Sequence, residues 1–164
     1  MKKLIFTVII VCSGICIAAA CARSRVVPSV SARLYFVDAE LNRLLPYEDV
    51  LPDADSEHKA QTAIKKLRNG RPDNEKIRQL IPRGSGKIAV TVKENVAYID
   101  LDRNIADQLP RSRDIERLFV YQLVDTLTSI KGISYARFTI DGNVRKEFMG
   151  YLDMRETYKF TYPE

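Results

Sequence analysis

The chain has 164 residues, of which 46% are hydrophobic and 29% charged, and its formal net charge is +5. This length suffices for one domain with a hydrophobic core, and the sequence contains no internal repeat or low-complexity tract. The charge is mild, without the dense basic patch and interleaved aromatics that nucleic-acid binding requires, so no nucleic-acid partner is expected.

The first residues form an export-signal pattern. Lys2 and Lys3 give a positive start, Leu4–Ile17 is almost wholly apolar, and Ala18–Ala20 are small residues placed directly before Cys21. A signal peptidase needs small side chains at the bond it cleaves, and the thiol of the next cysteine accepts acyl chains such as palmitate. The pattern resembles a bacterial lipoprotein signal and predicts lipidation of Cys21.

Two other fates of this segment stay open. The run from Leu4 to Ala20 is about 17 residues, the short limit for a helix that spans a membrane, so it could remain as an uncleaved anchor. Cleavage at Ala18-x-Ala20 would instead release a secreted protein. Cys16 is a poorer lipid site because bulky Ile15 precedes it. All these fates place the domain outside the cytoplasm, and the lipid anchor places it on the outer leaflet of the cell membrane.

The predicted organisation is a signal peptide over 1–20, a membrane-proximal linker over 21–32 and a folded domain over 33–164. Loss of Lys2 and Lys3 with the signal lowers the formal charge from +5 to +3. No cysteine follows Cys21, which excludes a disulfide, a thiolate metal site or a cysteine nucleophile from the mature domain.

Hydrophobic periodicity predicts strands over 33–38 and 44–51 at the start of the domain. A helix follows, with N-cap oxygens at 53–56 and a stop at Gly70. Its apolar stripe consists of Ala60, Ala63, Ile64 and Leu67. A second, short helix is predicted from Pro72 through Leu80.

A β-hairpin over 88–101 comes next, with its tight turn at Glu94-Asn95, where Asn tolerates positive φ. The longest helix is predicted to begin after Ser112 and to end at Gly132, with Asp114 and Glu116 in its first turn, where they suit the helix dipole. Its broad apolar stripe consists of Ile115, Leu118, Phe119, Leu123, Val124, Leu127 and Ile130.

A strand over 134–140 and a turn over 141–143 follow the long helix, and short strands are predicted over 147–149 and 158–160. The order is β(β)αββαβ, an α+β fold. We expect two helices packed on one face of a mixed three- to four-stranded sheet, because this arrangement buries both helical stripes.

The ordered set of motifs resembles the GerM domain family of bacterial sporulation and spore germination. The motifs are LYFVD at 34–38, the capped helix through Gly70, IPRG at 81–84, VAYIDLD at 96–102, VYQLVDTLTSIKGI at 120–133, ARFTIDGN at 136–143 and MGYLDM at 149–154. The resemblance implies a fold related to the ring-building modules of secretion-like assemblies. It also implies a role in building or anchoring an envelope complex, with other envelope proteins or further copies of the chain as partners.

No catalytic or metal-binding constellation is predicted, and no cofactor is expected. Asp100 and Asp102 share one strand face, but they are best explained as the end of a strand and the cap of the turn toward Asn104. His58 has no second histidine or cysteine with which to share a metal, and Ser85 lacks the G-x-S-x-G context of a nucleophile elbow. The Asp141-Gly142-Asn143 segment has too few oxygen ligands nearby to bind a cation and is predicted to be a turn.

The predicted partner surface is the sheet face that no helix covers. Strand alternation places on it Thr91, Tyr98, Tyr135, Arg137 and Thr139, beside Ala89, Val96 and Asp100. Tyr and Arg are enriched among residues that dominate protein interfaces. The same tyrosines would also shield the back of a one-layer sheet from water.

The sequence thus favours a non-catalytic assembly component on a lipid anchor. The alternative is a module that binds a cell-wall glycan or peptide, which would show a concave pocket lined by aromatic and polar groups. A cell-wall hydrolase is disfavoured because the mature chain lacks a His, Cys or metal constellation.

Overall fold

The computed structural model describes residues 28–71, 74–84 and 86–161. Its strands and helices, in chain order, are β1 (Ser29–Asp38), β2 (Leu44–Pro52), α1 (Ser56–Asn69), β3 (Ile77–Arg78), β4 (Ile88–Lys93), β5 (Val96–Leu101), α2 (Asn104–Asp107), α3 (Arg113–Thr128) and β6 (Tyr135–Ile140). The predicted α+β class is confirmed.

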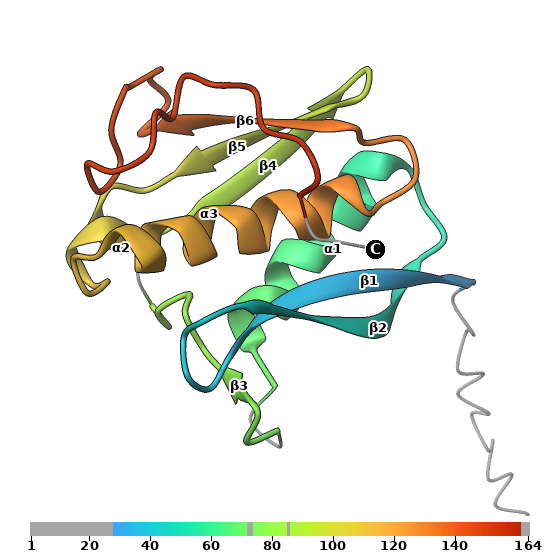
Figure 1. The fold of residues 1–164 in the computed structure, drawn as a ribbon. Coiled ribbons are helices and arrows are strands. Elements are labelled where there is room, and N and C mark those ends of the chain that lie inside the picture. Colours follow the sequence, from blue (N-terminus) through green and yellow to red (C-terminus); the bar gives the residue numbers. More distant parts are fainter. Residues whose placement is uncertain (1–27, 72–73, 85, 162–164) are drawn as a thin grey trace, which may run out of the picture.

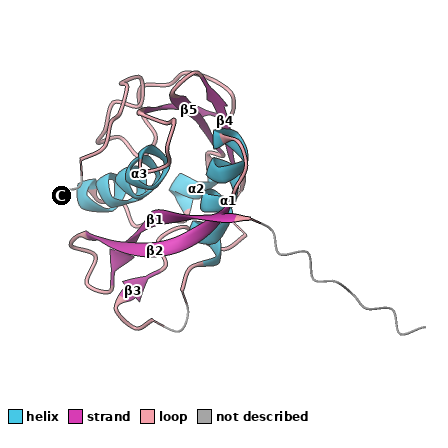
Figure 2. Cartoon of the chain, turned by 90° about the vertical axis from the view of Figure 1, so that its right-hand side faces the viewer, coloured by secondary structure: helices cyan, strands magenta, loops and turns pink. Residues whose placement is uncertain are grey.

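The strands form two sheets rather than the single sheet expected. One sheet has the order β2-β1-β3 and is antiparallel throughout; the other has the order β4-β5-β6, with β4 antiparallel and β6 parallel to β5. The helices α1 and α3 lie between the two sheets, as both views show (Figure 1, Figure 2). The mixed sheet carries the helices on one face, as predicted, and the β1–β2 hairpin closes the other side of the helix layer.

The two main helices begin and end at sequence signals. Asp55 caps α1 by accepting a hydrogen bond from the His58 N–H at 2.7 Å, and Ser112 caps α3 by accepting one from the Asp114 N–H at 3.3 Å. Gly70, at φ 66°, stops α1 as predicted. The last residue of α3 is Thr128, four residues before the predicted stop at Gly132.

The core fills the space between the sheets. All the residues of the predicted α1 stripe are buried, and so are those of the α3 stripe. Strand β1 is buried from Leu34 to Asp38; α3 and α1 pack against it, and β2 and β3 pair with its two edges. The sequence of a strand that is buried on both faces is a continuous apolar run, which explains the LYFV segment.

Three predicted local structures are wrong. A helix is predicted over 72–80, but the described part, 74–80, contains the two-residue strand β3, because its backbone pairs with the edge of β1 at Val37 and Asp38. The Gln79 amide also donates to the carbonyls of Leu67 and Arg68 at 3.2 Å. These contacts hold the chain extended, whereas an isolated helix of this length would be marginal.

The other two errors lie in the C-terminal segment. The segment 147–149 is not a strand; Phe148 is buried there and stacks on Phe119 with ring centroids 5.5 Å apart. The segment 158–160 contributes only an isolated bridge between Tyr158 and Ala136. Side-chain packing, and not a strand ladder, therefore fixes most of this segment.

Two boundaries also differ in detail. Strand β1 begins at Ser29, so the last residues of the predicted linker pair with β2. In the hairpin, the residue with positive φ is Glu94, at 56°, rather than Asn95.

Candidate functional site

The outer face of the β4-β5-β6 sheet brings the predicted partner residues together. The register aligns Thr91 with Tyr98 on the neighbouring strand and Tyr98 with Arg137 on the next. The adjacent rows are Ala89, Asp100 and Thr139 on one side and Lys93, Val96 and Tyr135 on the other. We call these nine residues the sheet face.

Burial alternates along the strands as the sequence predicts. Tyr98 and Tyr135 are 37% and 41% exposed, and Thr91 and Arg137 are exposed beside them. Their chain neighbours, among them Ala97, Ile99, Ala136 and Phe138, are buried against the helices. The sheet face therefore exposes two aromatic rings and the cationic side chains of Lys93 and Arg137.

The row of the sheet face that contains Asp100 and Thr139 forms hydrogen bonds within the protein. The Thr139 hydroxyl donates to Asp100 Oδ1 at 2.7 Å, and the Gly142 N–H donates to the same oxygen at 2.7 Å. Asp100 thus holds the 141–143 turn against β5. The groups left for a partner are mainly the two tyrosines, the two cations and Thr91.

Part of each edge of this sheet is covered. On the β4 side, the Val92 N–H donates to Glu57 Oε2 of α1 at 2.9 Å. On the β6 side, the Ala136 and Tyr158 backbones exchange two hydrogen bonds of 2.9 and 2.8 Å. These contacts occupy part of each edge at which another strand could add.

The described residues considered for catalysis lie on two parts of the fold: Asp100 and Asp102 at the end of β5, and His58 on α1. Asp102 Oδ1 accepts a hydrogen bond from the Asn104 N–H at 2.9 Å, within the turn that leads into α2. His58 lies exposed in the first turn of α1. Within the described ranges, no group of three or more His, Cys, Asp or Glu could hold a metal ion. Ser85 and Cys21 lie outside the described residues.

The clearly shifted pKa values belong to structural groups. The Arg155 guanidinium donates to Asp153 and lowers the pKa of that carboxyl to about 2. Burial raises the pKa of the Tyr158 phenol to about 12. Its ring packs edge-on against Phe138 at 5.3 Å, and its hydroxyl donates to the Asp153 carbonyl at 2.9 Å. Neither group belongs to the sheet face.

Sequence reasoning missed the role of Glu116. Its carboxylate is 0% exposed and accepts hydrogen bonds from the backbone N–H groups of Met149, Tyr151 and Leu152 at 2.8, 2.8 and 3.1 Å. Glu116 therefore fastens the C-terminal segment to α3. The only sequence signal was an acidic residue beside the predicted apolar stripe.

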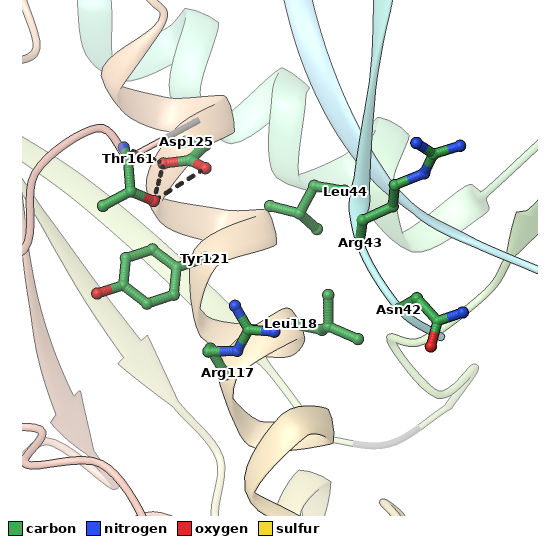
Figure 3. A pocket seen from close by; sticks show the side chains of 8 residues that line it. All are labelled: Asn42, Arg43, Leu44, Arg117, Leu118, Tyr121, Asp125 and Thr161. Carbon is green, nitrogen blue, oxygen red and sulfur yellow. Dashed lines mark hydrogen bonds between the residues drawn. The ribbon is translucent and has the colours of Figure 1, made fainter. Parts of the chain in front are cut away.

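The structure also contains a groove that the sequence did not predict. It has a volume of about 560 Å³ and lies between α3 and the start of β2 (Figure 3). We call it the α3 groove; it is lined by Asn42, Arg43, Leu44, Arg117, Leu118, Tyr121, Asp125 and Thr161. Its walls carry an aromatic ring, two arginines and the Asp125 carboxylate.

The comparisons with known proteins assign the family. A family model described as "Germane: Sporulation and spore germination" matches residues 33–146. That match covers most of the chain, and the protein belongs to the Germane family, as its resemblance to GerM domains indicated. No curated protein sequence matches the chain.

Solved structures share the fold. The first GerMN domain of the Bacillus subtilis sporulation protein GerM is 23% identical, with a TM-score of 0.57, over 80% of this chain and 97% of that one. The tandem GerMN domains of the same protein are 22% identical, with a TM-score of 0.60, over 82% of this chain and 46% of that one. A chain from Clostridium perfringens described as a candidate lipoprotein is 18% identical, with a TM-score of 0.56, over 81% of this chain and 87% of that one. None of the three is named as an enzyme.

Proposed function

We propose that this protein is a lipid-anchored, non-catalytic assembly component of an extracytoplasmic envelope complex, and that it contacts a protein partner through the sheet face. The family supports a role in sporulation and spore germination. No helix among the described residues has the length and apolar character needed to cross a bilayer. In this proposal the membrane attachment comes from lipid on Cys21.

The spacing between anchor and domain supports a position close to the membrane. Ser29, the first residue of β1, follows Cys21 by eight positions. A stretch of this length reaches at most about 28 Å. The domain would therefore stay within a few nanometres of the bilayer.

The orientation of the fold supports the sheet face as the contact surface. The tether enters through β1, in the sheet on one side of the helix layer, whereas the sheet face lies on the opposite side of that layer (Figure 1, Figure 2). The sheet face is thus free to meet a partner when β1 is held toward the membrane. Its two exposed tyrosines are the observation that carries the proposal, since large aromatic side chains contribute strongly to interfaces. Lys93 and Arg137 favour a partner with an acidic surface.

The anchor is tested by the intact mass of the protein purified from membranes. We expect a mature chain that begins at a diacylated Cys21. Cys21→Ser should remove the lipid, whereas Cys16→Ser, the matched control inside the signal, should leave the mature mass unchanged. A mature chain that begins at any other residue would refute the lipid tether.

The contact surface is tested by a triple variant of Tyr98→Ser, Tyr135→Ser and Arg137→Ser. We expect it to remain folded and membrane-bound but to lose partner recruitment in cross-linked native membranes. The matched control replaces exposed residues of the C-terminal segment, Val144→Ser, Arg145→Ser and Tyr151→Ser, and should recruit normally. Normal recruitment by the folded sheet-face variant would rule out this surface.

A further inference from the structure

The outer edge of β2 determines whether a further strand can join the β2-β1-β3 sheet. In an antiparallel pair, residues that bond to the partner strand alternate with residues whose backbone groups point outward. The Asp38 N–H donates to the Arg43 carbonyl at 3.0 Å, which sets this alternation for β1 and β2. The outward positions of β2 are therefore Leu44, Pro46, Glu48, Val50 and Pro52.

Three of these five outward positions offer no free N–H group. Pro46 and Pro52 have no backbone N–H, and proline is tolerated in a strand when it lies on such an edge. The Val50 N–H is used within the strand itself, because it donates to Asp49 Oδ1 at 2.7 Å. Pro46 lies between the two positions that keep a donor. A further strand therefore cannot bond to two consecutive outward N–H groups of β2.

The first turns of α1 cover the outward edge of β4. Glu57 Oε2 accepts a hydrogen bond from the Val92 N–H at 2.9 Å, and the Gln61 amide donates to the Val90 carbonyl at 3.5 Å. Glu57 and Gln61 are four residues apart, so they lie on one face of the helix. The Gln61 amide also donates to Glu57 Oε1 at 3.3 Å, which holds the two side chains together. In this way α1 occupies a donor and an acceptor to which another strand would bind.

The end of α3 covers the second edge of β1 by the same kind of contact. Strand β3 pairs with two residues of this edge. Further along it, the Thr126 hydroxyl accepts a hydrogen bond from the Tyr35 N–H at 2.9 Å. The Ser129 hydroxyl donates to the Arg33 carbonyl at 2.8 Å. Thr126 is fully buried, so another strand cannot reach the Tyr35 N–H without displacing α3.

From these contacts we infer that the fold contains a device against strand addition, which prevents copies of the chain from joining through their strand edges. Unpaired strand edges are where aggregation and domain swapping commonly begin. The proposed lipid anchor would concentrate the protein in two dimensions and so increase this hazard. The inference depends on the proposed function only for that crowding, because the covered edges belong to the fold itself. Association is thereby directed to faces such as the sheet face.

The β2 edge is tested by combining Pro46→Thr with Pro52→Thr, which restores two outward N–H groups. Self-association of the full chain in nonionic detergent is measured by sedimentation equilibrium, with the solvent matched to the density of the detergent. The variant should associate at least about tenfold more tightly than the wild type, because paired β2 edges gain hydrogen bonds from both copies. Pro110→Thr, the matched control in an exposed loop, should behave as the wild type. The same difference should persist in the background of the sheet-face triple variant, which removes association through that face.

The β4 edge provides a second test, which decides the matter if the proline variant loses its native circular dichroism spectrum. Glu57→Ala combined with Gln61→Ala uncovers the edge, so the Val92 amide should exchange at least about tenfold faster and self-association should tighten as above. Lys65→Ala, at an exposed position of the same helix, should change neither. A folded proline variant that associates no more tightly than Pro110→Thr would overturn the inference. So would a wild-type exchange rate at Val92, or wild-type self-association, in the α1 variant.

Discussion

The attachment of the C-terminal segment to α3 predicts that one buried carboxylate controls much of the stability of this domain. Glu116 is 0% exposed and accepts hydrogen bonds from three backbone N–H groups of the segment 149–152. In Glu116→Gln, one carboxylate oxygen becomes an NH₂ group that faces backbone donors. In Glu116→Ala, all three donors lose this acceptor and a cavity forms.

The magnitude follows from the cost of leaving buried donors unpaired. A hydrogen bond to a charged group contributes about 1.5–3 kcal/mol, and a buried group left without a partner costs about 1–3 kcal/mol. The three bonds share one carboxylate, so their energies do not simply add. We expect the free energy of unfolding to fall by about 2–4 kcal/mol for Glu116→Gln and by about 3–5 kcal/mol for Glu116→Ala.

The assay is urea unfolding of the full chain at pH 7, followed by far-UV circular dichroism because the protein contains no tryptophan. The control is Asp114→Asn, two residues earlier in the same helix, where the side chain is 75% exposed and the change should stay within about 0.5 kcal/mol. Hydrogen exchange should also show lost protection at the amides of Met149, Tyr151 and Leu152. Equal stability of Glu116→Gln and Asp114→Asn would refute this account of the segment.

Three further predictions concern stability. Burial raises the pKa of the Tyr158 phenol from its ordinary value of 10.0 to about 12. The contribution of this group to the stability of the fold is therefore complete below pH 10 and is lost as the pH rises toward 12. The free energy of unfolding of Tyr158→Phe should depend less on pH in this window than that of the wild type. Gly132→Ala should destabilise by about 1–2 kcal/mol in urea unfolding, because φ is +95° and a Cβ would lie 2.7 Å from Ser56 Oγ; stability equal to wild type would contradict this strain. Phe119→Ala removes a fully buried ring and should cost about 3–5 kcal/mol by the same assay; a loss below about 1 kcal/mol would show that the site is not tightly packed.

The parts of the fold that local signals determine could be predicted from the sequence. Asp55 and Ser112 cap their helices, Gly70 stops α1, and the alternation in 88–101 gives a hairpin with the correct faces. These features depend on residues close together in the chain. The arrangement of Thr91, Tyr98 and Arg137 in one row then follows from the register of the strands.

The parts that depend on distant contacts could not be predicted. Strand β3 exists because β1 offers it an edge, and nothing within the segment 72–80 reveals that edge. The role of Glu116 depends on N–H groups more than thirty positions away. The α3 groove likewise combines a turn near the start of the domain with Thr161 near its end. Each needs the tertiary structure before its residues can be associated.

The central claim, that the sheet face contacts a protein partner in the envelope, is tested most directly by photo-cross-linking in native membranes. A photo-reactive phenylalanine is placed at position 98, or at the exposed control position 151. We predict a discrete cross-linked species of defined mass from position 98 that is absent from position 151 and is lost when Arg137→Ser is added. Equal cross-linking patterns from the two positions, or none from position 98, would contradict the claim.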